Sequence, residues 1–381
     1  MRNEMTKARI VSLRSAVGTE LSTRAPWPKV KLGEICDIFT GKKDVNQTVT
    51  NGPYRFFSCA PTLFRSNEYI FDGAAIIVAG NGSYTGRVTY YEGKFDLYQR
   101  TYACTIAKQQ LADIKFIYDV MRLRFQKEIR GSLKGASIPY IVKGHLSDFE
   151  IPLPPLPVQR RIADVLSAYD DLIENNRRRI AILEETARLA YRKWFGGVEE
   201  GRTATLGEIA DVVMGQSPES KTYNDNGEGL PFHQGVTGFG FRYPRNEMWC
   251  TAGTRFAEEG DILFSVRAPV GRINVAGERI VIGRGLSAMR AKNGFQSWLL
   301  YALKHHFSKE DMIGVGCIFA STTKKELLSV ALPFPPDEEI AAFEQIAGPI
   351  DAQIKAQSKQ NAALATARDM LLPRLMKGFN N

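Results

Sequence analysis

The spacing of apolar residues along the chain predicts two long helices. After Pro157, apolar side chains recur at alternating intervals of four and three residues, which is the heptad spacing of a coiled coil. The positions are Ile162, Leu166, Tyr169, Ile173, Ile180, Leu183, Ala187, Ala190 and Trp194, with the polar Asn176 between the fourth and fifth. A second, more polar series keeps the same phase at Phe343, Ala347, Ile350, Ile354, Gln357, Asn361, Leu364, Arg368 and Leu371. Asn176 and Gln357 are equivalent polar interruptions, which in a coiled coil usually fix the register.

Each helical segment spans roughly 35 to 40 residues, so each helix should be about 55 to 60 Å long. A helix of that length is not held by intrinsic propensity and needs a partner along its apolar seam. Because a globular segment separates the two helices in the sequence, we expect them to pair with each other in antiparallel orientation. Two unrelated bundle helices are the alternative, and they fit the heptads but not the duplication described below.

The segments before each helix predict mixed α/β domains. In the first, short β-rich runs at 34–39, 74–79, 87–91 and 101–106 are separated by Gly, Asn and Ser turns. A helix is predicted at 111–129, ended by Gly131. The second segment repeats this order, with strands at 208–213, 261–267 and 279–282 and a helix at 296–307.

The chain also repeats particular phrases. Residues 32–41 (LGEICDIFTG) return later in the chain as 206–215 (LGEIADVVMG), and 151–155 (IPLPP) return as 332–336 (LPFPP). A repeat unit as long as a whole domain indicates domain duplication rather than a solenoid. The predicted fold class is α/β (α+β), with two similar domains separated by two long helices that form an antiparallel coiled coil. The predicted segments are an N-terminal basic arm at 1–26, domains at 27–150 and 197–331, and long helices at 151–196 and 332–381.

Composition narrows the class of protein. The net charge of +9 and the pI of about 9.2 are compatible with a polyanionic partner, although many basic proteins have none. No apolar run long enough to span a membrane occurs, and the segment 1–26 lacks the apolar core of a secretory signal, so we expect a cytoplasmic protein. The five cysteines are scattered without a C-x-x-C pair, and the four histidines lack ligand spacing. A disulfide framework, a zinc site and a metal-dependent mechanism are therefore not expected.

Motifs that would indicate an enzyme are missing or weak. A methyltransferase would need an Asn or Asp before a Pro-Pro-aromatic loop, and the strings at 153–156 (LPPL) and 334–337 (FPPD) lack it. They are better explained as rigid entries to the helices. Gly80, Gly82 and Gly86 match a dinucleotide fingerprint poorly and are more typical of a turn. Neither a phosphate-binding P-loop nor a nucleophile elbow occurs, so we expect no catalytic, cofactor or metal residues in this chain.

Several phrases resemble one known family. Residues 131–139 (GSLKGASIP), 146–155 (LSDFEIPLPP) and 158–163 (VQRRIA) resemble the conserved end of a target recognition domain in the specificity subunits of type I restriction-modification systems. Residues 265–272 (SVRAPVGR) and 282–288 (IGRGLSA) are similar to signatures of the second domain in that family. The resemblance covers about residues 27–378.

The resemblance implies a non-catalytic subunit whose two recognition domains each bind one half of a split double-stranded DNA target. The two helices would act as a spacer and would dock two modification (methyltransferase) subunits and, for cleavage, restriction (translocase-nuclease) subunits. S-adenosylmethionine, ATP and magnesium would belong to those partners. There are two rival hypotheses. The first is a scaffold that binds only protein, and the DNA affinity of the assembled complex tests it. The second is a catalytic modification or nuclease chain, and a methyl-transfer assay on the isolated chain tests it.

Two departures from an exact repeat carry expectations of their own. The first domain has 81–87 (NGSYTGR) where the second has 267–272 (RAPVGR), so the two half-sites should differ. The second helix begins with 336–340 (PDEEI) and lacks the Gln-Arg-Arg of the first, so the two ends need not dock partners equally.

The candidate DNA-binding residues are basic and amide side chains in loops at strand ends. Arg binds guanine and Asn or Gln binds adenine through paired hydrogen bonds, whereas Lys and Ser commonly contact phosphate. The candidates are Lys42, Lys43, Asn81, Ser83, Tyr84, Arg87, Gln99, Arg100, Lys134, Ser137, Gln216, Lys221, Tyr223, His233, Gln234, Arg267, Arg272, Arg284, Lys324 and Lys325. For each, a merely solvated or bracing role is the alternative, with Arg272 and Arg284 the clearest cases for bracing.

Overall fold

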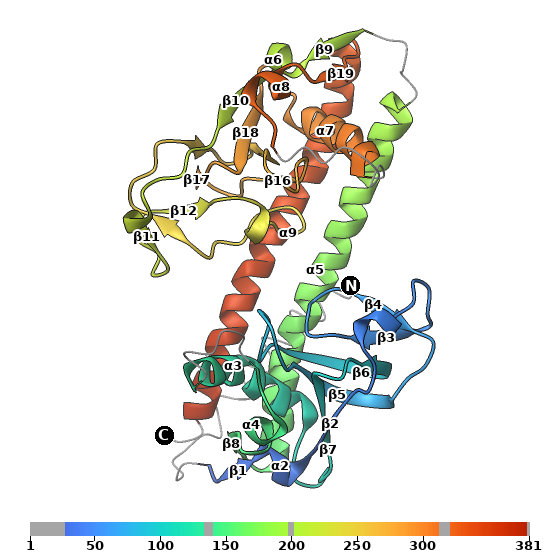
Figure 1. Cartoon of the computed structure of the whole chain (residues 1–381), viewed down its shortest axis with the longest axis vertical. Helices are drawn as coiled ribbons and strands as arrows, with labels where there is room; N and C mark the ends of the chain where they lie inside the picture. The colour runs from blue at the N-terminus through green and yellow to red at the C-terminus, as the bar shows by residue number, and fades with distance from the viewer. Residues whose placement is uncertain (1–26, 133–139, 197–201, 312–320, 379–381) are drawn as a thin grey trace. The chain divides into compact units, whose positions relative to one another are not determined.

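The computed structural model describes residues 27–132, 140–196, 202–311 and 321–378. The chain divides into two compact units, which are Met1–Asn175 with Gln360–Asn381 (unit 1) and Asn176–Lys359 (unit 2). Each unit contains a mixed α/β domain and part of both long helices, α5 (Leu156–Phe195) and α9 (Asp337–Gly378) (Figure 1). Among the described helices, none is long and apolar enough to cross a membrane.

Unit 1 is built on a six-stranded sheet in the order β2-β7-β5-β6-β3-β4. Its neighbouring strands are antiparallel except for β3 and β6, which are parallel. A separate antiparallel pair joins β1 to β8. The elements are β1 (Lys29–Lys31), α2 (Leu32–Ile35), β2 (Cys36–Thr40), β3 (Tyr54–Phe57), β4 (Phe64–Ser66), β5 (Phe71–Ala79), β6 (Val88–Leu97), β7 (Thr101–Ile106), α3 (Ile114–Ser132), α4 (Lys143–Ser147) and β8 (Glu150–Pro152).

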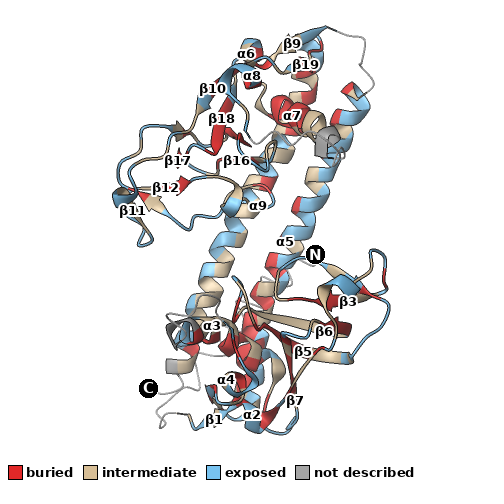
Figure 2. Ribbon diagram, in the orientation of Figure 1, coloured by how far each residue is buried: buried red, intermediate tan, exposed pale blue. Residues whose placement is uncertain are grey.

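The core of unit 1 lies between the sheet, α3 and the first half of α5. Phe116 and Phe125 of α3 are fully buried against Ile76 of β5, and each such side chain stabilises the fold by about 2 to 3 kcal/mol. The buried residues of these elements are red in Figure 2. A smaller cluster includes Ile77 and Phe95. Alternate residues of β5 thus enter two different clusters, as expected for a strand covered on both sides.

Unit 2 contains a four-stranded sheet in the order β10-β18-β15-β16 and a five-stranded sheet in the order β11-β13-β12-β17-β14, and β9 pairs with β19. Its elements are β9 (Thr203–Thr205), α6 (Leu206–Ile209), β10 (Ala210–Met214), β11 (Tyr223–Asn224), β12 (Leu230–His233), β13 (Trp249–Cys250), β14 (Phe256–Ala257), β15 (Ile262–Ser265), β16 (Ile273–Val275), β17 (Ile280–Ile282), β18 (Leu286–Ala291), α7 (Gln296–Asp311), α8 (Lys324–Leu328) and β19 (Ala331–Pro333).

The predicted duplication is confirmed in the strand register. Lys31 pairs with Glu150 in unit 1, and Thr205 pairs with Ala331 in unit 2. Each of these residues directly precedes one of the repeated phrases, so the two pairs are equivalent in the repeat. The order β10-β18-β15-β16 likewise repeats β2-β7-β5-β6. Two similar α/β domains with two long helices, the predicted fold class, are therefore what the chain forms.

The two long helices contribute to one core within each unit, partly through predicted heptad positions such as Leu166 and Phe343 and partly through residues outside the predicted heptad positions. In unit 1, Leu166 of α5 is buried in one core with Leu372 and Leu375 near the end of α9. In unit 2, the rings of Tyr191 and Phe195 near the end of α5 contact Phe343 near the start of α9, with centroids 5.8 and 5.6 Å apart. The start of each helix thus packs near the end of the other, which is antiparallel pairing.

Both predicted polar interruptions lie inward in unit 2. Asn176 is buried, and the Oε1 atom of Gln357 is buried without a hydrogen-bond partner in the described part of the chain. The helices have 40 and 42 residues, close to the expected length.

Several predicted element bounds were wrong, for identifiable reasons. The strands expected at 34–39 and 208–213 begin two residues late, because their first residues belong to the short helices α2 and α6. In α6 the Glu208 carboxylate accepts hydrogen bonds from the Thr205 backbone N–H at 2.6 Å and its hydroxyl at 2.8 Å, a capping box that the β pattern concealed.

The helix of the first domain is also displaced from its predicted bounds. It begins at Ile114, because the Asp113 carboxylate accepts the Lys115 and Phe116 N–H groups at 3.0 Å, and it continues past Gly131. Strands β11, β13 and β14 have two residues each, too few for a periodic pattern to predict. The arm at 1–26 lies outside the described residues, and the domain boundaries drawn from the sequence stay a prediction.

Candidate nucleic-acid interface

Four segments of unit 1 meet at one end of the strands of its sheet. They are residues 41–44, 80–87, 98–100 and 140–141, and together we call them loop cluster 1. The strand pairs Thr40 with Tyr102 and Ala79 with Thr101 bring the ends of β2 and β5 beside the start of β7. Backbone hydrogen bonds then connect the segments. They are Gly80 N–H to Arg100 O (3.0 Å), Gln99 N–H to Lys43 O (2.9 Å) and Ile141 N–H to Gly80 O (2.8 Å).

The structure gathers eight of the ten first-domain candidates into loop cluster 1. They are Lys42, Lys43, Asn81, Ser83, Tyr84, Arg87, Gln99 and Arg100. Lys134 and Ser137 lie outside the described residues, in the stretch of sequence between α3 and Tyr140 of the cluster. Residues as far apart in the sequence as Lys42 and Arg100 thus share one surface.

Two of these candidates brace the cluster. The Lys43 ammonium contacts the carboxylates of Asp96 at 2.8 Å and Glu68 at 2.7 Å. Burial lowers the pKa of Lys43, but hydrogen bonds to these two carboxylates raise it more. The Arg87 Nη2 atom donates to Ala60 O at 3.0 Å, and burial lowers the pKa of this guanidinium. Lys42, Ser83, Tyr84, Gln99 and Arg100 form the exposed part.

Unit 2 carries an equivalent surface, loop cluster 2, made of residues 215–218, 234, 266–272, 283–285 and 321–322. The Val266 N–H donates to Gly285 O at 3.0 Å, and the Thr322 N–H donates to Val266 O at 2.8 Å. The Ser217 hydroxyl donates to Gln234 Oε1 at 2.9 Å. These bonds join the loop after β10 to the loop after β12, and the loop after β15 to the residues before β18 and before α8.

Glycines allow both clusters to close. A Cβ atom on Gly41 would lie 1.8 Å from Leu97 O, and one on Gly215 would lie 2.2 Å from Gly283 O. Any side chain at these positions would therefore displace the neighbouring backbone, which is the end of β6 at Gly41 and the loop before β18 at Gly215. Gly41 and Gly215 are the last residues of the repeated phrases 32–41 and 206–215, so this close approach belongs to the duplicated framework.

Loop cluster 2 contains five exposed second-domain candidates, namely Gln216, Gln234, Arg267, Arg272 and Arg284. The other five lie elsewhere. Lys221 is exposed and paired with Glu219, and Lys324 and Lys325 are exposed at the start of α8.

Tyr223 and His233 support unit 2 from within. The Tyr223 ring stacks on Phe232 at 4.6 Å, and its hydroxyl donates to Pro218 O at 2.8 Å. His233 is 4% exposed, its Nε2 atom is 3.1 Å from Asn246 Oδ1, and burial lowers its pKa. The structure thus places His233 behind the surface rather than on it.

Sequence reasoning missed Arg255, which is exposed beside loop cluster 2. Its carbonyl oxygen accepts the Ile282 N–H at 3.0 Å, next to the loop that carries Arg284. It precedes the two-residue strand β14, so no strand pattern in the sequence indicated that it lies at a strand end.

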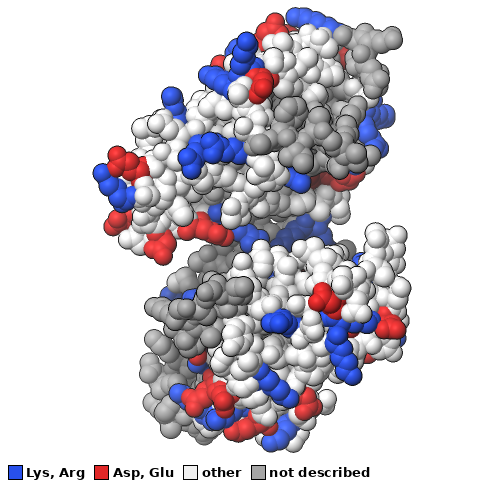
Figure 3. Space-filling view, viewed as in Figure 1, with Lys and Arg blue, Asp and Glu red and all other residues white. Residues whose placement is uncertain are grey.

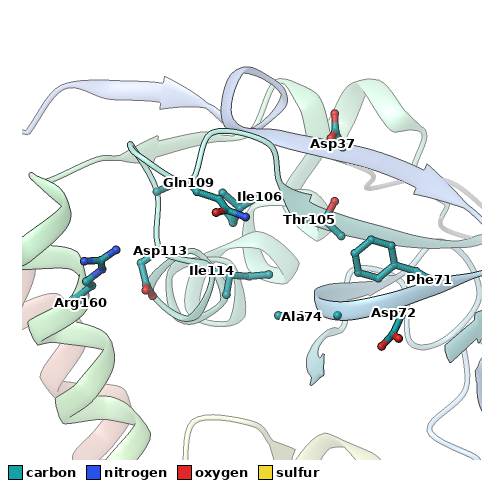
Figure 4. A pocket seen from close by; sticks show the side chains of 12 residues that line it. Asp37, Phe71, Asp72, Ala74, Thr105, Ile106, Gln109, Asp113, Ile114 and Arg160 are labelled. Carbon is teal, nitrogen blue, oxygen red and sulfur yellow. The ribbon is translucent and has the colours of Figure 1, made fainter. Parts of the chain in front are cut away.

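One cavity of unit 1, of about 600 Å³, does not resemble a nucleic-acid site. Figure 4 shows Asp113 and Arg160 near each other, and Asp72 beside Phe71 farther along the lining. With Asp37, the lining holds three carboxylates to one guanidinium, so it would repel a polyanion. A smaller cavity of about 210 Å³ adjoins Lys42 and Lys43.

Surface charge alone does not mark the interface. On the face shown in Figure 3, Lys and Arg side chains alternate with Asp and Glu on both units instead of forming one basic patch. Among the described residues, no group of three or more His, Cys, Asp or Glu could hold a metal ion. The candidate interface therefore rests on the two loop clusters.

Comparison with known proteins agrees with this architecture. A family model described as "Type I restriction modification DNA specificity domain" matches twice, at residues 25–185 and 199–363. Each match includes one α/β domain and part of a long helix. The chain therefore belongs to the type I restriction-modification specificity family and carries two recognition domains.

Individual relatives support the assignment. The chain is 31% identical over 317 residues to the putative type I restriction enzyme MjaX specificity subunit of Methanocaldococcus jannaschii, covering 77% of this chain and 75% of that one. It is 36% identical over 154 residues to the EcoDI specificity subunit of Escherichia coli, a match to 33% of that protein. The crystal structure of the type I restriction-modification S subunit from M. genitalium shares the fold, with a TM-score of 0.57 at 20% identity, covering 95% and 97% of the two chains.

Proposed function

We propose that this chain is the non-catalytic specificity subunit of a type I restriction-modification complex and that it reads a bipartite double-stranded DNA target. Loop cluster 1 would contact one half-site and loop cluster 2 the other. The observation that carries the proposal is that one backbone framework, duplicated in the chain, presents two different sets of basic and amide side chains. Duplicated readers with different side chains suit a target whose two halves differ in sequence.

The partners follow from the same proposal. Two modification (methyltransferase) subunits would dock on the long helices, and restriction (translocase-nuclease) subunits would join for cleavage. S-adenosylmethionine, ATP and magnesium would then be bound by those subunits and not by this chain. Such a complex would act on DNA in the cytoplasm.

The proposal is tested by binding selection on random duplexes. The chain would be assembled with modification subunits of the same restriction-modification system, and bound DNA would be recovered and sequenced at near-physiological salt, because ionic strength controls non-specific binding. We expect one motif with two specified parts and an unspecified gap. A modification complex that binds as well without this chain, or an assembled complex that enriches no sequence, would contradict the proposal.

A further inference from the structure

The two loop clusters contain one position at which the side chain is different but the backbone is equivalent. Building on the proposed function, we propose that Asn81 and Arg267 occupy the same reading position in the two units. Asn81 would select an adenine in one half-site, and Arg267 would select a guanine at the matching place in the other.

Bridge partners establish that the positions are equivalent. Asn81 forms an isolated antiparallel bridge with Tyr140, and Arg267 forms one with Ser321. Tyr140 precedes the phrase 151–155 by the same interval as Ser321 precedes its repeat at 332–336. Each bridge therefore joins the same two places in the duplicated framework.

The residue before each reading position is held in the same way. Gly80 donates its N–H to the carbonyl of Arg100, the residue before β7, and Val266 donates to Gly285, the residue before β18. The carbonyl of Gly80 accepts the Ile141 N–H, and that of Val266 accepts the Thr322 N–H, both at 2.8 Å. Two hydrogen bonds and a bridge thus fix where each side chain leaves the backbone.

The loops that follow are also tied down. In unit 2 the Ser265 hydroxyl donates to Pro269 O at 2.6 Å and accepts the Arg272 N–H at 2.8 Å. In unit 1 the Thr85 hydroxyl donates to Gly82 O at 2.7 Å. A side chain on such a fixed loop loses less conformational freedom on binding than one on a mobile loop.

The chemistry of the two side chains differs in the way that base recognition requires. A guanidinium can donate two hydrogen bonds to O6 and N7 of guanine, and a carboxamide can accept from N6 and donate to N7 of adenine. Arg267 is exposed, and its guanidinium forms no hydrogen bond or ion pair within the described chain. It is therefore available for a base edge.

A second pair shows the same exchange, although less cleanly. Gln99 and Arg284 each lie two residues before the equivalent strands β7 and β18. The Gln99 carboxamide already donates to Asp44 Oδ2 at 3.1 Å, whereas the Arg284 guanidinium forms no hydrogen bond or ion pair within the described residues. Asn81 and Arg267 are therefore the sharper test.

The experiment exchanges the two side chains in the full assembled complex. Arg267→Asn and Asn81→Arg would be compared with wild type by binding selection, followed by competition between duplexes that differ at one base pair. Arg202→Asn is the matched control, because Arg202 is exposed beside β9, at the opposite end of β10 from loop cluster 2, and its guanidinium lies over the Phe334 ring.

We expect Arg267→Asn to change one G·C position in one half-site toward A·T and to leave the other half and the gap unchanged. Asn81→Arg should make the reciprocal change in the other half. Discrimination at the affected position should shift by roughly tenfold to a hundredfold. Arg202→Asn should leave the motif as in wild type.

Three results would overturn the inference. If both variants kept the wild-type motif, the proposed function would stand and these residues would not read bases. If Arg267→Asn weakened binding to all duplexes equally and reduced the salt dependence, Arg267 would contact phosphate instead. If the wild-type complex selected no motif, the proposed function would fall and this inference with it.

A melting temperature and a subunit-assembly measurement for each variant show that any loss of binding is not a loss of folding. Arg267→Gln gives a second amide variant if Arg267→Asn does not assemble.

Discussion

The Arg242 guanidinium donates a hydrogen bond of 2.7 Å to the carboxylate of Glu184, inside unit 2. Arg242 belongs to the segment between β12 and β13 and is 3% exposed at its side chain, and Glu184 belongs to α5. The same guanidinium also bonds Asp351 of α9. Burial lowers the pKa of Arg242, but Asp351 and Glu184 raise it more, so the group stays charged. One residue of the domain is therefore joined to both long helices of its unit.

Removing this guanidinium should destabilise unit 2. Arg242→Met takes the guanidinium away from two partly buried carboxylates, of which Glu184 keeps Lys304 as a partner, and breaking such a buried pair costs about 3 kcal/mol. Chemical denaturation followed by far-UV circular dichroism measures the loss. The control is Arg188→Met, which breaks the exposed pair with Glu185 on the same helix and should change stability little. Removing Asp351 in the same variant should recover part of the lost free energy of unfolding. If the two substitutions instead lowered it additively, Arg242 and Asp351 would not be coupled.

Gln159 should be needed for packing at the start of α5. Its side chain is fully buried, its Nε2 atom donates to Leu111 O at 2.8 Å and Pro154 O at 2.7 Å, and its Oε1 atom accepts the Asp113 N–H at 2.9 Å. Gln159→Leu leaves these three backbone groups unpaired and should lower the free energy of unfolding by about 2 to 4 kcal/mol. The neighbouring exposed Arg160→Ala is the control. Equal stabilities of the two variants would show that the hydrogen bonds are unimportant.

The close approach at Gly41 and Gly215 predicts that an alanine at either position disturbs one loop cluster. We expect Gly41→Ala and Gly215→Ala each to cost about 2 kcal/mol or more, because the added methyl group meets a backbone oxygen. Each should weaken specificity in one half-site only, which binding selection would report. Gly144→Ala in α4 is the control, since its Cβ would meet nothing within 4 Å. A change in both half-sites from one substitution would contradict separate readers.

Asp119 should make the stability of unit 1 depend on pH. Burial raises the pKa of Asp119 to about 7, against the opposing effect of Arg122. Between about pH 4 and 7 the unfolded chain releases this proton while the folded protein keeps it, so stability falls as pH rises through that window. Below and above the window the effect is constant.

The measurement is the difference in melting temperature between wild type and Asp119→Asn from pH 4 to 8. We expect the relative stability of wild type to decrease toward pH 7 and then to level off. Asp148→Asn, at an exposed position paired with Lys31, is the control. Parallel curves for wild type and Asp119→Asn would show that Asp119 titrates at its ordinary pKa.

The duplication and the helices could be predicted from the sequence because they depend on long patterns. The heptads extend over many successive positions in each helix, so isolated polar substitutions such as Asn176 do not hide them. The positions at which the helices α3 and α6 begin were harder to predict. The carboxylates of Asp113 and Glu208 accept backbone N–H groups and so fix where the helices α3 and α6 begin. The spacing of apolar residues gives no information about such hydrogen bonds.

The candidate site was predictable by residue type but not by position. Basic and amide residues in loops were found and the segments 81–87 and 267–272 were matched, but the bridges that hold Asn81 and Arg267 at one equivalent position are seen only in the folded chain. His233 was chosen for its chemistry, but the folded chain buries it against Asn246. Burial of a polar side chain depends on what packs over it from distant segments, which no local window contains.

The central claim, two separate readers on one chain, is tested most directly by a domain exchange read out by DNA methylation. Residues 198–331 would be replaced by the corresponding domain of a relative, and the methylated motif would be sequenced from cells that carry the chain and its modification subunits. We predict a split motif in which one half changes and the other half stays as in wild type. A change in both halves, or a methylated motif that does not depend on this chain, would contradict the account.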